Sequence, residues 1–341
     1  MSELVLIANA GDATISAFVL ADDTLRPLAT TALSGSCSTF AVDADRDLVY
    51  AAVKGEPPAI LTLSLDRAAG VLTQVGRADC GPVPAYVDLA PGGGALLGAS
   101  YHAGVGTVWP LTDGRLGEAV ALIAHPNLHC VITTSTGSNA YFVSLGADLV
   151  AQYSLSATGH LTPLDPPTVA APAGSGARHL TLSADQRSAY LVTEYSGEVI
   201  RLDRDAETGV LTPAEKVSIV NPDAALTHSR FGADPRAEHL IWGADVHVGR
   251  GFVLATERSA STLASISMDA DGHLGRVVDL CPTEQQPRGF AVTNDGTRAV
   301  VVGELSTSVT LHGLGPDGQI SVLDRVETGR GANWVRVLPL G

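Results

Sequence analysis

The sequence repeats one pattern seven times, and this repetition limits the possible folds more than any other feature does. A polar turn followed by the apolar start of a strand recurs at Thr24-Leu25, Gly70-Val71, Arg115-Leu116, His160-Leu161, Gly209-Val210, His273-Leu274 and Gln319-Ile320. These landmarks lie roughly 44–50 residues apart, except for one interval of about 63 residues between the fifth and the sixth. A period of this length is typical of the four-stranded blades of a β-propeller.

Each repeat reads as a series of short antiparallel strands. In one unit, "HLTLS" is followed by the turn "ADQRS", the strand "AYLVTE", a polar hairpin and the alternating strand "EVIRLDR". Short runs of β-formers, period-two alternation and turn clusters indicate β structure, and helical periodicity is nearly absent. The length of 341 residues alone suggests two domains. The repeats instead predict an all-β protein, with residues 1–341 forming a single seven-bladed β-propeller domain.

The two ends of the chain are predicted to complete one blade together. The tail "ETGRGANWVRVLPLG" resembles the opening of a further blade, whereas the first residues lack such an opening strand. We therefore expect residues 333–340 to form the inner strand of the blade that residues 3–28 complete, which closes the ring and removes free sheet edges. The long interval contains "NPDAALTHSRFGADPRAEHLIWGADVHVG", residues 221–249, which we predict to be a loop between the fifth and sixth blades.

Composition excludes several classes of partner. The formal net charge is −15, and the chain has only two lysines, Lys54 and Lys216. A nucleic-acid partner is not expected, because sequence-independent binding of phosphate polymers needs a broad basic surface. No apolar run approaches the ~18–20 residues that cross a bilayer, so we expect no membrane association. Since the start also lacks a basic leader, we expect a cytoplasmic protein.

Metal and cofactor chemistry is not expected either. The four cysteines, Cys37, Cys80, Cys130 and Cys281, are scattered without a CxxC pair, which favours reduced structural thiols. His125 and His129 have metal-ligand spacing, but Pro126 lies between them in a non-helical setting. The Gly-rich stretches "GSGARH" and "GRGAN" precede strands and are weak as nucleotide loops, and no GxSxG elbow occurs. We predict no metal and no cofactor.

Candidate site residues lie where inner strands begin. In a propeller these strands line the central channel, so residues at their starts gather at one mouth of it. These positions hold His129, Arg178, His179, His247 and Arg288, and second strands add Tyr101, His102, Glu194, Glu257, Arg258 and Glu304. Arginine forks and imidazoles suit a small anionic substrate with an ester or carbonyl group. For His179 a buried core role competes with this one, and Glu257 and Glu304 are also candidates for contacts between blades.

The chain resembles the propeller-type 6-phosphogluconolactonases, a family that also includes the fungal carboxy-muconate lactonizing enzymes. The resemblance rests on "GASYHAGVGTVWPLTDG", "GSGARHLTLSADQRSAYLVTE", "ADVHVGRGFVLATERSASTLASISMDADGHL", "PTEQQPRGFAVTNDG" and "GRGANWVRVLP". It implies a metal-free, seven-bladed enzyme that acts on a sugar-acid lactone. The family's functional histidine, arginine and glutamate correspond to His129, Arg178 and Glu194. The chain departs from the family at Ala177, usually a proline, and at His102, often a smaller amide.

Lactone opening assigns a role to each candidate. It needs an activated water and hydrogen-bond donors for the developing oxyanion. His129 is the first candidate for the base, Glu194 either orients a histidine or is itself the base, and Arg178 stabilises the oxyanion. Arg258 and Arg288, which match further arginines of the family, hold a remote phosphate or carboxylate. Tyr101, His102, His179 and His247 complete the expected substrate-binding set.

Three functional classes stay open at this point. The first is a hydrolase of a sugar-acid lactone, either phosphorylated or with a distal carboxylate. The second is an isomerase of the carboxy-muconate lactonizing type. The third is a non-catalytic propeller that binds a partner, because a fold alone does not fix function. The expected partner is a small anionic lactone, and the ring can be a monomer or a weak homo-oligomer.

Overall fold

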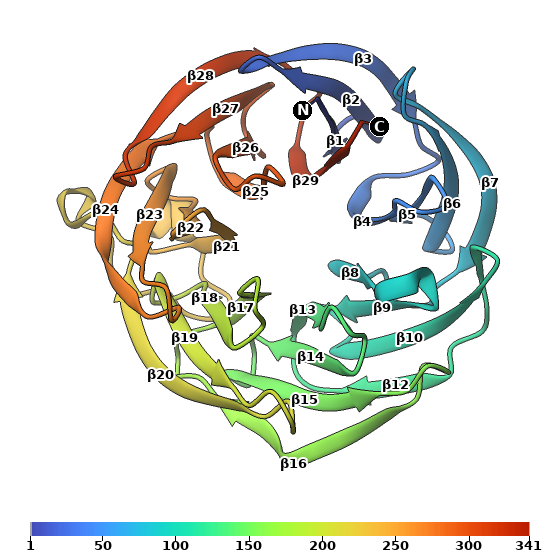
Figure 1. The fold of residues 1–341 in the computed structure, drawn as a ribbon, viewed down its shortest axis with the longest axis horizontal. Coiled ribbons are helices and arrows are strands. Elements are labelled where there is room, and N and C mark those ends of the chain that lie inside the picture. The colour runs from blue at the N-terminus through green and yellow to red at the C-terminus, as the bar shows by residue number, and fades with distance from the viewer. Residues whose placement is uncertain (1, 341) are drawn as a thin grey trace.

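The computed structural model describes residues 2–340 and shows seven antiparallel sheets arranged around a central axis (Figure 1). The first blade consists of β29 (Ala332–Pro339), β1 (Glu3–Asn9), β2 (Thr14–Ala21) and β3 (Thr24–Ala32), and the second of β4 (Cys37–Asp43), β5 (Leu48–Val53), β6 (Ala59–Asp66) and β7 (Val71–Asp79). The third blade consists of β8 (Tyr86–Leu89), β9 (Ala95–Ser100), β10 (Val105–Thr112), β11 (Arg115–Leu116) and β12 (Ala121–Ala124), with the 3-10 helix η1 (Pro91–Gly93) between β8 and β9. The fourth consists of β13 (Leu128–Thr133), β14 (Asn139–Ser144), β15 (Leu149–Leu155) and β16 (Leu161–Ala170).

The last three blades follow the same order from the axis outwards. They consist of β17 (Ala177–Leu182), β18 (Ser188–Thr193), β19 (Glu198–Arg204) and β20 (Leu211–Ser218); β21 (Gly243–Gly249), β22 (Phe252–Glu257), β23 (Thr262–Met268) and β24 (Leu274–Pro282); and β25 (Pro287–Val292), β26 (Arg298–Gly303), β27 (Ser308–Leu314) and β28 (Ile320–Glu327). The seven-bladed all-β prediction is confirmed. All seven sequence landmarks fall at, or one or two residues before, the start of an outer strand.

Burial explains why the strands differ in sequence pattern. The second strand of a blade is covered on both faces by neighbouring blades, so every residue of β18 is buried and its sequence, "SAYLVT", is continuously apolar or small. The outer strand β20 alternates between buried or half-buried and exposed positions over much of its length. The hydrophobic core therefore lies between blades, where aromatic side chains such as Tyr141, Tyr190 and Phe142 are fully buried.

The ends of the chain close the ring as the sequence predicts. β1 pairs with β29 in antiparallel register, with Leu4 opposite Leu338 and Leu6 opposite Arg336. The observed strand runs from Ala332 to Pro339, one residue earlier at each end than predicted. In Figure 1 β29 lies innermost in a blade whose other strands come from the N-terminus. β29 thus covers the edge of β1 that would otherwise be left unpaired, and it completes the four strands of the first blade.

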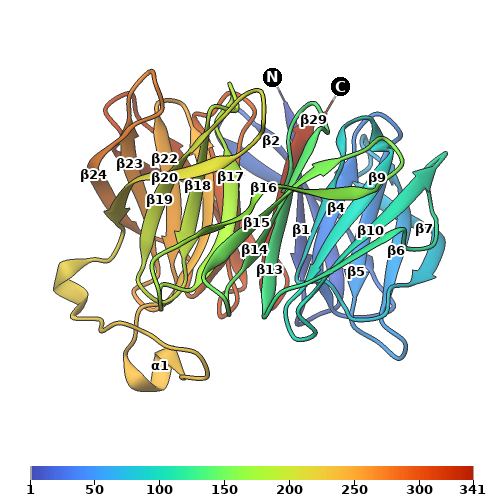
Figure 2. The ribbon, with the colours of Figure 1, turned by 90° about the horizontal axis from the view of Figure 1, so that it is seen from below.

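The predicted loop at residues 221–249 is too long by one strand. Residues 243–249 form β21, the inner strand of the sixth blade, and the insertion proper ends at Trp242. It contains the 3-10 helix η2 (Pro222–Ala224) and the short helix α1 (Pro235–Glu238). Figure 2 shows α1 projecting from the face opposite the marked chain ends, which is the face where the inner strands begin. No helix within residues 2–340 is long and apolar enough to cross a bilayer.

Candidate active site

A β-bulge at the start of several inner strands sets the position of the candidate residues. The ladder register passes from Leu128 to Cys130 in β13, and it makes the same step over Arg178 in β17 and over Arg288 in β25. The bulged residues are therefore His129, Arg178 and Arg288. A bulge bends its strand and redirects the side chain of the extra residue. The same irregularity at equivalent places leaves Ser38 of β4 and Asn333 of β29 outside the ladder.

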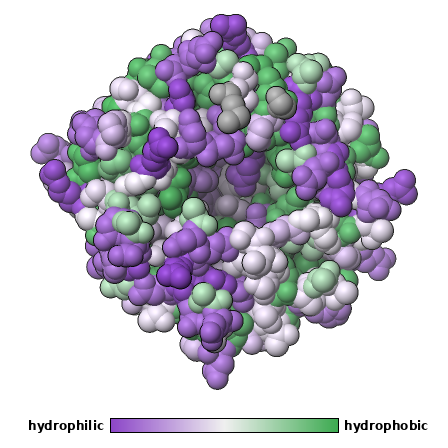
Figure 3. Space-filling view, viewed as in Figure 1, coloured by the Kyte–Doolittle hydropathy of each residue, from purple (hydrophilic) through white to green (hydrophobic). Residues whose placement is uncertain are grey.

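These bulged residues line one pocket of about 370 Å³ at the channel mouth where the inner strands begin. Its lining includes seven of the nine predicted site residues, namely Tyr101, His102, His129, Arg178, Glu194, Arg258 and Arg288. Residues from several blades thus meet around one cavity, although they are far apart in sequence. The other end of the channel opens as a hollow at the centre of the face seen in Figure 3.

Glu194 binds two arginines from neighbouring blades through one oxygen. Arg178 donates from Nε to Glu194 Oε2 at 2.9 Å, and Arg258 donates from Nη2 to the same oxygen at 2.9 Å. Both arginine side chains are buried, and Glu194 keeps 15% of its side-chain surface exposed. Burial and the neighbouring Arg178 lower the pKa of Arg258 to about 9, so it is cationic at neutral pH. One carboxylate therefore faces two positive charges, which leaves this cluster positive.

Packing fixes the orientation of both arginines. Arg178 Nη1 donates to the carbonyl oxygen of Ala244 and lies 3.2 Å from Nε2 of His179. The guanidinium of Arg258 stacks on the Trp242 ring, with 3.7 Å between its central carbon and the ring centroid. Cation–π stacking is strongest when the cation is desolvated, as it is here. The two donors are held in place before any ligand binds, which is the condition for effective stabilisation of an oxyanion.

His129 is a buried imidazole beside this cluster. Its ring is 5.5 Å from that of Tyr101 and 5.0 Å from that of His179, measured between centroids. Burial, followed by the positive charge of Arg178, holds the pKa of His129 well below its usual range. The ring is consequently neutral at pH 7 and has a lone pair to accept a proton. Its Nδ1 is buried and has no hydrogen-bond partner among residues 2–340.

Arg288 pairs with a different carboxylate. Its Nη1 donates to Glu304 Oε1 at 2.9 Å, and the amide of Gln286 donates to the other oxygen of Glu304. Burial opposes ionisation of Glu304, but the charges of Arg288 and Arg258 outweigh it and lower the pKa of Glu304 to about 2. Arg288 is thus neutralised by a carboxylate that is ionised at neutral pH. Both members of this ion pair, Arg288 and Glu304, line the pocket.

His179 and His247, from the expected substrate-binding set, do not line the pocket, and neither does the further candidate Glu257. Nδ1 of His179 lies 2.7 Å from Asp245 Oδ1, and Nε2 of His247 lies 3.2 Å from Asp245 Oδ2. Burial and the charge of Arg178 lower the pKa of His179 to about 3, so this ring is neutral. Its contacts with Asp245 and Arg178 support the site from outside the pocket lining. His247 is the fifth residue of β21 rather than its opening residue, because the strand begins earlier than the loop prediction implied.

Several residues that line the pocket were not predicted from the sequence. Lys54, Ser38, Trp242 and Asn333 all line the pocket. Asn333 and Ser38 occupy the same bulge position as His129, so a comparison of the inner strands by position, rather than by side-chain type, would have found them. Cys37 also lines it, but burial raises the pKa of its thiol to about 12, which keeps it from acting as a thiolate nucleophile.

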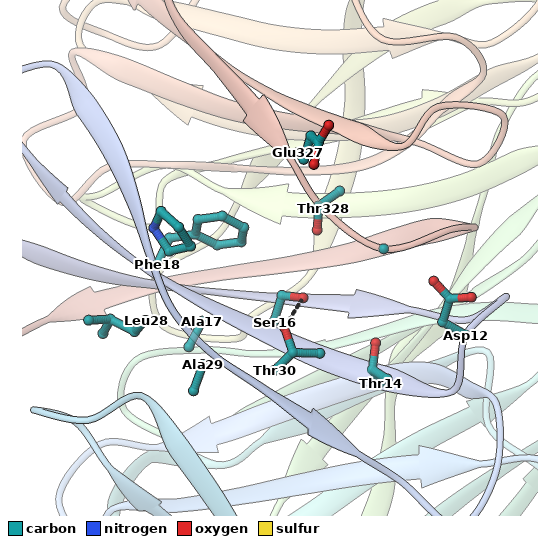
Figure 4. A pocket seen from close by; sticks show the side chains of 12 residues that line it. Asp12, Thr14, Ser16, Ala17, Phe18, Leu28, Ala29, Thr30, Glu327 and Thr328 are labelled. Carbon is teal, nitrogen blue, oxygen red and sulfur yellow. Dashed lines mark hydrogen bonds between the residues drawn. The ribbon is translucent and has the colours of Figure 1, made fainter.

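A separate hollow of about 530 Å³ lies on the outside of the ring, where the first and last blades meet. Figure 4 shows its mixed lining, in which apolar side chains such as Phe18 and Leu28 lie near Ser16 and Thr30, whose hydroxyl groups are hydrogen bonded at 3.2 Å. None of the predicted site residues lines it. Residues 2–340 contain no group of three or more His, Cys, Asp or Glu side chains placed to hold a metal ion.

Comparison with known proteins agrees with this architecture. The chain is 28% identical to the 6-phosphogluconolactonase of Serratia proteamaculans over 99% of both chains, and 28% identical to that of Pectobacterium carotovorum over the whole of both. A periplasmic gluconolactonase of Pseudomonas aeruginosa has the same fold, with a TM-score of 0.87, 24% identity and full coverage of both chains. Residues 6–336 match the family described as "Lactonase, 7-bladed beta-propeller". The chain therefore belongs to the family of seven-bladed β-propeller lactonases.

Proposed function

We propose that this protein hydrolyses a sugar-acid lactone in the pocket at the channel mouth. The observation that carries the proposal is the arrangement of Arg178 and Arg258 around Glu194, with the neutral imidazole of His129 in the same cavity. Its relatives named 6-phosphogluconolactonase support lactone hydrolysis as the reaction class. The pocket also has more cationic than anionic side chains, in a chain whose net charge is −15.

The reaction assigns a proton path to these groups. Water attacks the ring carbonyl carbon and transfers one proton to His129, and the carbonyl oxygen becomes an oxyanion that accepts hydrogen bonds from Arg178. The C–O bond of the ring then breaks, and the proton on His129 passes to the departing alkoxide oxygen. The product is the open hydroxy acid. Preorganised donors of this kind are each worth about 2.7–4 kcal/mol of transition-state stabilisation.

Glu194 has a positioning role in this scheme. From the sequence, two roles are open for Glu194: it orients a histidine, or it is itself the base. Its contacts in the structure are with Arg178 and Arg258, not with a histidine. By binding both arginines through Oε2, Glu194 fixes their separation. His129 is the candidate base because it lines the pocket beside the arginine pair and its Nδ1 has no hydrogen-bond partner among residues 2–340.

A proton-release assay tests the proposal directly. Purified protein is added at pH 7 to a panel of lactones, both phosphorylated and not, and the acid released is titrated after subtraction of spontaneous hydrolysis. We expect acceleration with at least one sugar-acid lactone and its loss in Arg178→Ala. Spontaneous rates throughout the panel would refute the proposal. Acid release that yields an unsaturated acid, with no water added to the product, would indicate the carboxy-muconate lactonizing type of reaction instead.

A further inference from the structure

The cationic residues of the pocket are unequally neutralised. Arg178 and Arg258 share one carboxylate, Glu194, and Arg288 is matched by Glu304. Lys54 forms none of the ion pairs found among residues 2–340, and it is exposed at the rim. Two centres of uncompensated positive charge therefore remain in the lining, one at the arginine pair and the other at Lys54.

The ring places these two centres across the mouth from each other. Arg178 and Arg258 belong to the fifth and sixth blades, whereas Lys54 follows β5 in the second blade, three blades from the fifth (Figure 1). The arginine pair lies beside His129, where the carbonyl reacts in the proposed reaction. Lys54 is thus placed for the part of the substrate that does not react.

Asn333, on the adjacent first blade, has an unsatisfied buried acceptor. Its Nδ2 donates to the carbonyl oxygens of Cys37 and Ser38 at 3.3 and 3.0 Å, which fixes the orientation of the amide. Its Oδ1 is buried and has no hydrogen-bond partner among residues 2–340, although the residue lines the pocket. Buried polar atoms are nearly always hydrogen bonded, so an orphaned oxygen in a cavity wall needs a donor from a ligand or from a water that a ligand can displace. A sugar hydroxyl is such a donor.

We propose that Lys54 and Asn333 form a second substrate-binding subsite, which holds the distal end of an anionic sugar lactone. Lys54 pairs with a phosphate or carboxylate remote from the ring carbonyl, and Asn333 Oδ1 accepts a hydrogen bond from a hydroxyl of the same molecule. This inference rests on the proposed lactonase function and narrows its substrate to lactones with a remote negative charge.

The test for Lys54 compares charged and neutral substrates. We measure kcat/KM of wild type, Lys54→Met and Lys54→Arg on 6-phosphogluconolactone, glucarolactone and uncharged glucono-δ-lactone. Lys54→Met should lower kcat/KM about tenfold on the charged lactones, mainly through KM, and change the neutral one less than twofold. Lys54→Arg should restore most of the loss. The larger effect among the two charged substrates identifies phosphate or carboxylate as the preferred group.

Lys216→Met is the matched control, because Lys216 is the only other lysine and pairs with Glu198 at 2.7 Å on the fifth blade. It should leave all three rates unchanged. Equal losses on charged and neutral lactones in Lys54→Met, or no loss on either, would overturn the role of Lys54.

Asn333 is tested with a lactone that has no hydroxyl groups. Asn333→Ala should lower kcat/KM for glucono-δ-lactone several-fold and leave δ-valerolactone unchanged, whereas a purely structural role would lower both equally.

Calorimetric binding of 6-phosphogluconate and gluconate separates this inference from the proposed function. If the wild type hydrolyses no lactone, the function fails, but preferential binding of 6-phosphogluconate that disappears in Lys54→Met still supports the subsite. Equal affinity of the two acids for the wild type, or no binding of either, would refute it.

Discussion

Replacing Arg178 by lysine tests the proposed oxyanion site without removing its charge. The guanidinium donates from Nε to Glu194 and from Nη1 to Ala244 O, and it lies against Nε2 of His179. A lysine ammonium is a single point and cannot reproduce this planar set of contacts. The ammonium can retain the ion pair with Glu194, but it then no longer directs a hydrogen-bond donor toward the substrate carbonyl.

The expected loss follows from the geometry of these contacts. One misplaced oxyanion donor costs about 2.7–4 kcal/mol of transition-state stabilisation, which is a hundred- to thousandfold decrease in kcat. KM should change far less, because the oxyanion exists only in the transition state. Breaking the buried contacts should also lower the free energy of unfolding by about 1.5–3 kcal/mol. Initial rates from proton release and chemical denaturation measure the two effects separately.

Arg201→Lys is the matched control for this experiment. Arg201 is a buried arginine of the same blade that pairs with Asp203 and Glu215 and does not line the pocket. It should lose stability to a similar extent and keep kcat within about twofold. An equal fall of kcat in both variants, or a normal kcat in Arg178→Lys, would refute the assignment of Arg178 to the oxyanion.

Three further outcomes follow from the structure. Arg288→Ala should raise KM several-fold with little change in kcat, because it leaves the pocket-lining carboxylate of Glu304 without its partner and so repels an anionic substrate; steady-state kinetics would contradict this if kcat fell instead. Removing residues 332–341 deletes β29 and opens the ring, so the truncated protein should unfold, and an unchanged Tm would be inconsistent with closure. Burial lowers the pKa of His312 to about 4, from 6.5 in the unfolded chain. The unfolded state therefore binds the extra proton, and stability from this group, about 3 kcal/mol at most, is complete above pH 6.5 and is lost as pH falls through 4. His312→Gln should flatten the dependence of unfolding free energy on pH between 4 and 6.5, and an unchanged slope would show that the histidine is not buried neutral.

The blade architecture could be predicted from sequence because it depends on repetition. The turns before Leu25, Val71 and Leu161 recur at blade spacing because each blade needs one turn that joins its third strand to its outer strand. The closure of the ring by the two chain ends could also be predicted, because residues 333–340 read as an inner strand that no further strands of a blade follow. The boundary of the long loop was misplaced because "GADVHVG" is short and polar at its centre, where Asp245 and His247 are joined by a hydrogen bond.

The site was predictable only in part, because sequence shows which residues begin inner strands but not which way they point. Arg178 and His179 are adjacent, yet the bulge sends Arg178 into the pocket lining and leaves His179 against Asp245. Asn333 has no charge to attract notice, although it has the same bulge position. Lys54 follows a second strand without a motif, and only the ring brings it to the mouth.

The most direct measurement is a crystal structure of the protein with 6-phosphogluconate bound at saturating concentration. Electron density is expected in the pocket at the channel mouth, with a carboxylate oxygen accepting a hydrogen bond from Arg178 and the phosphate toward Lys54. A ligand bound only in the outer hollow of Figure 4, or a pocket that stays empty at saturation, would contradict the claim that the bulged inner strands build one lactone site.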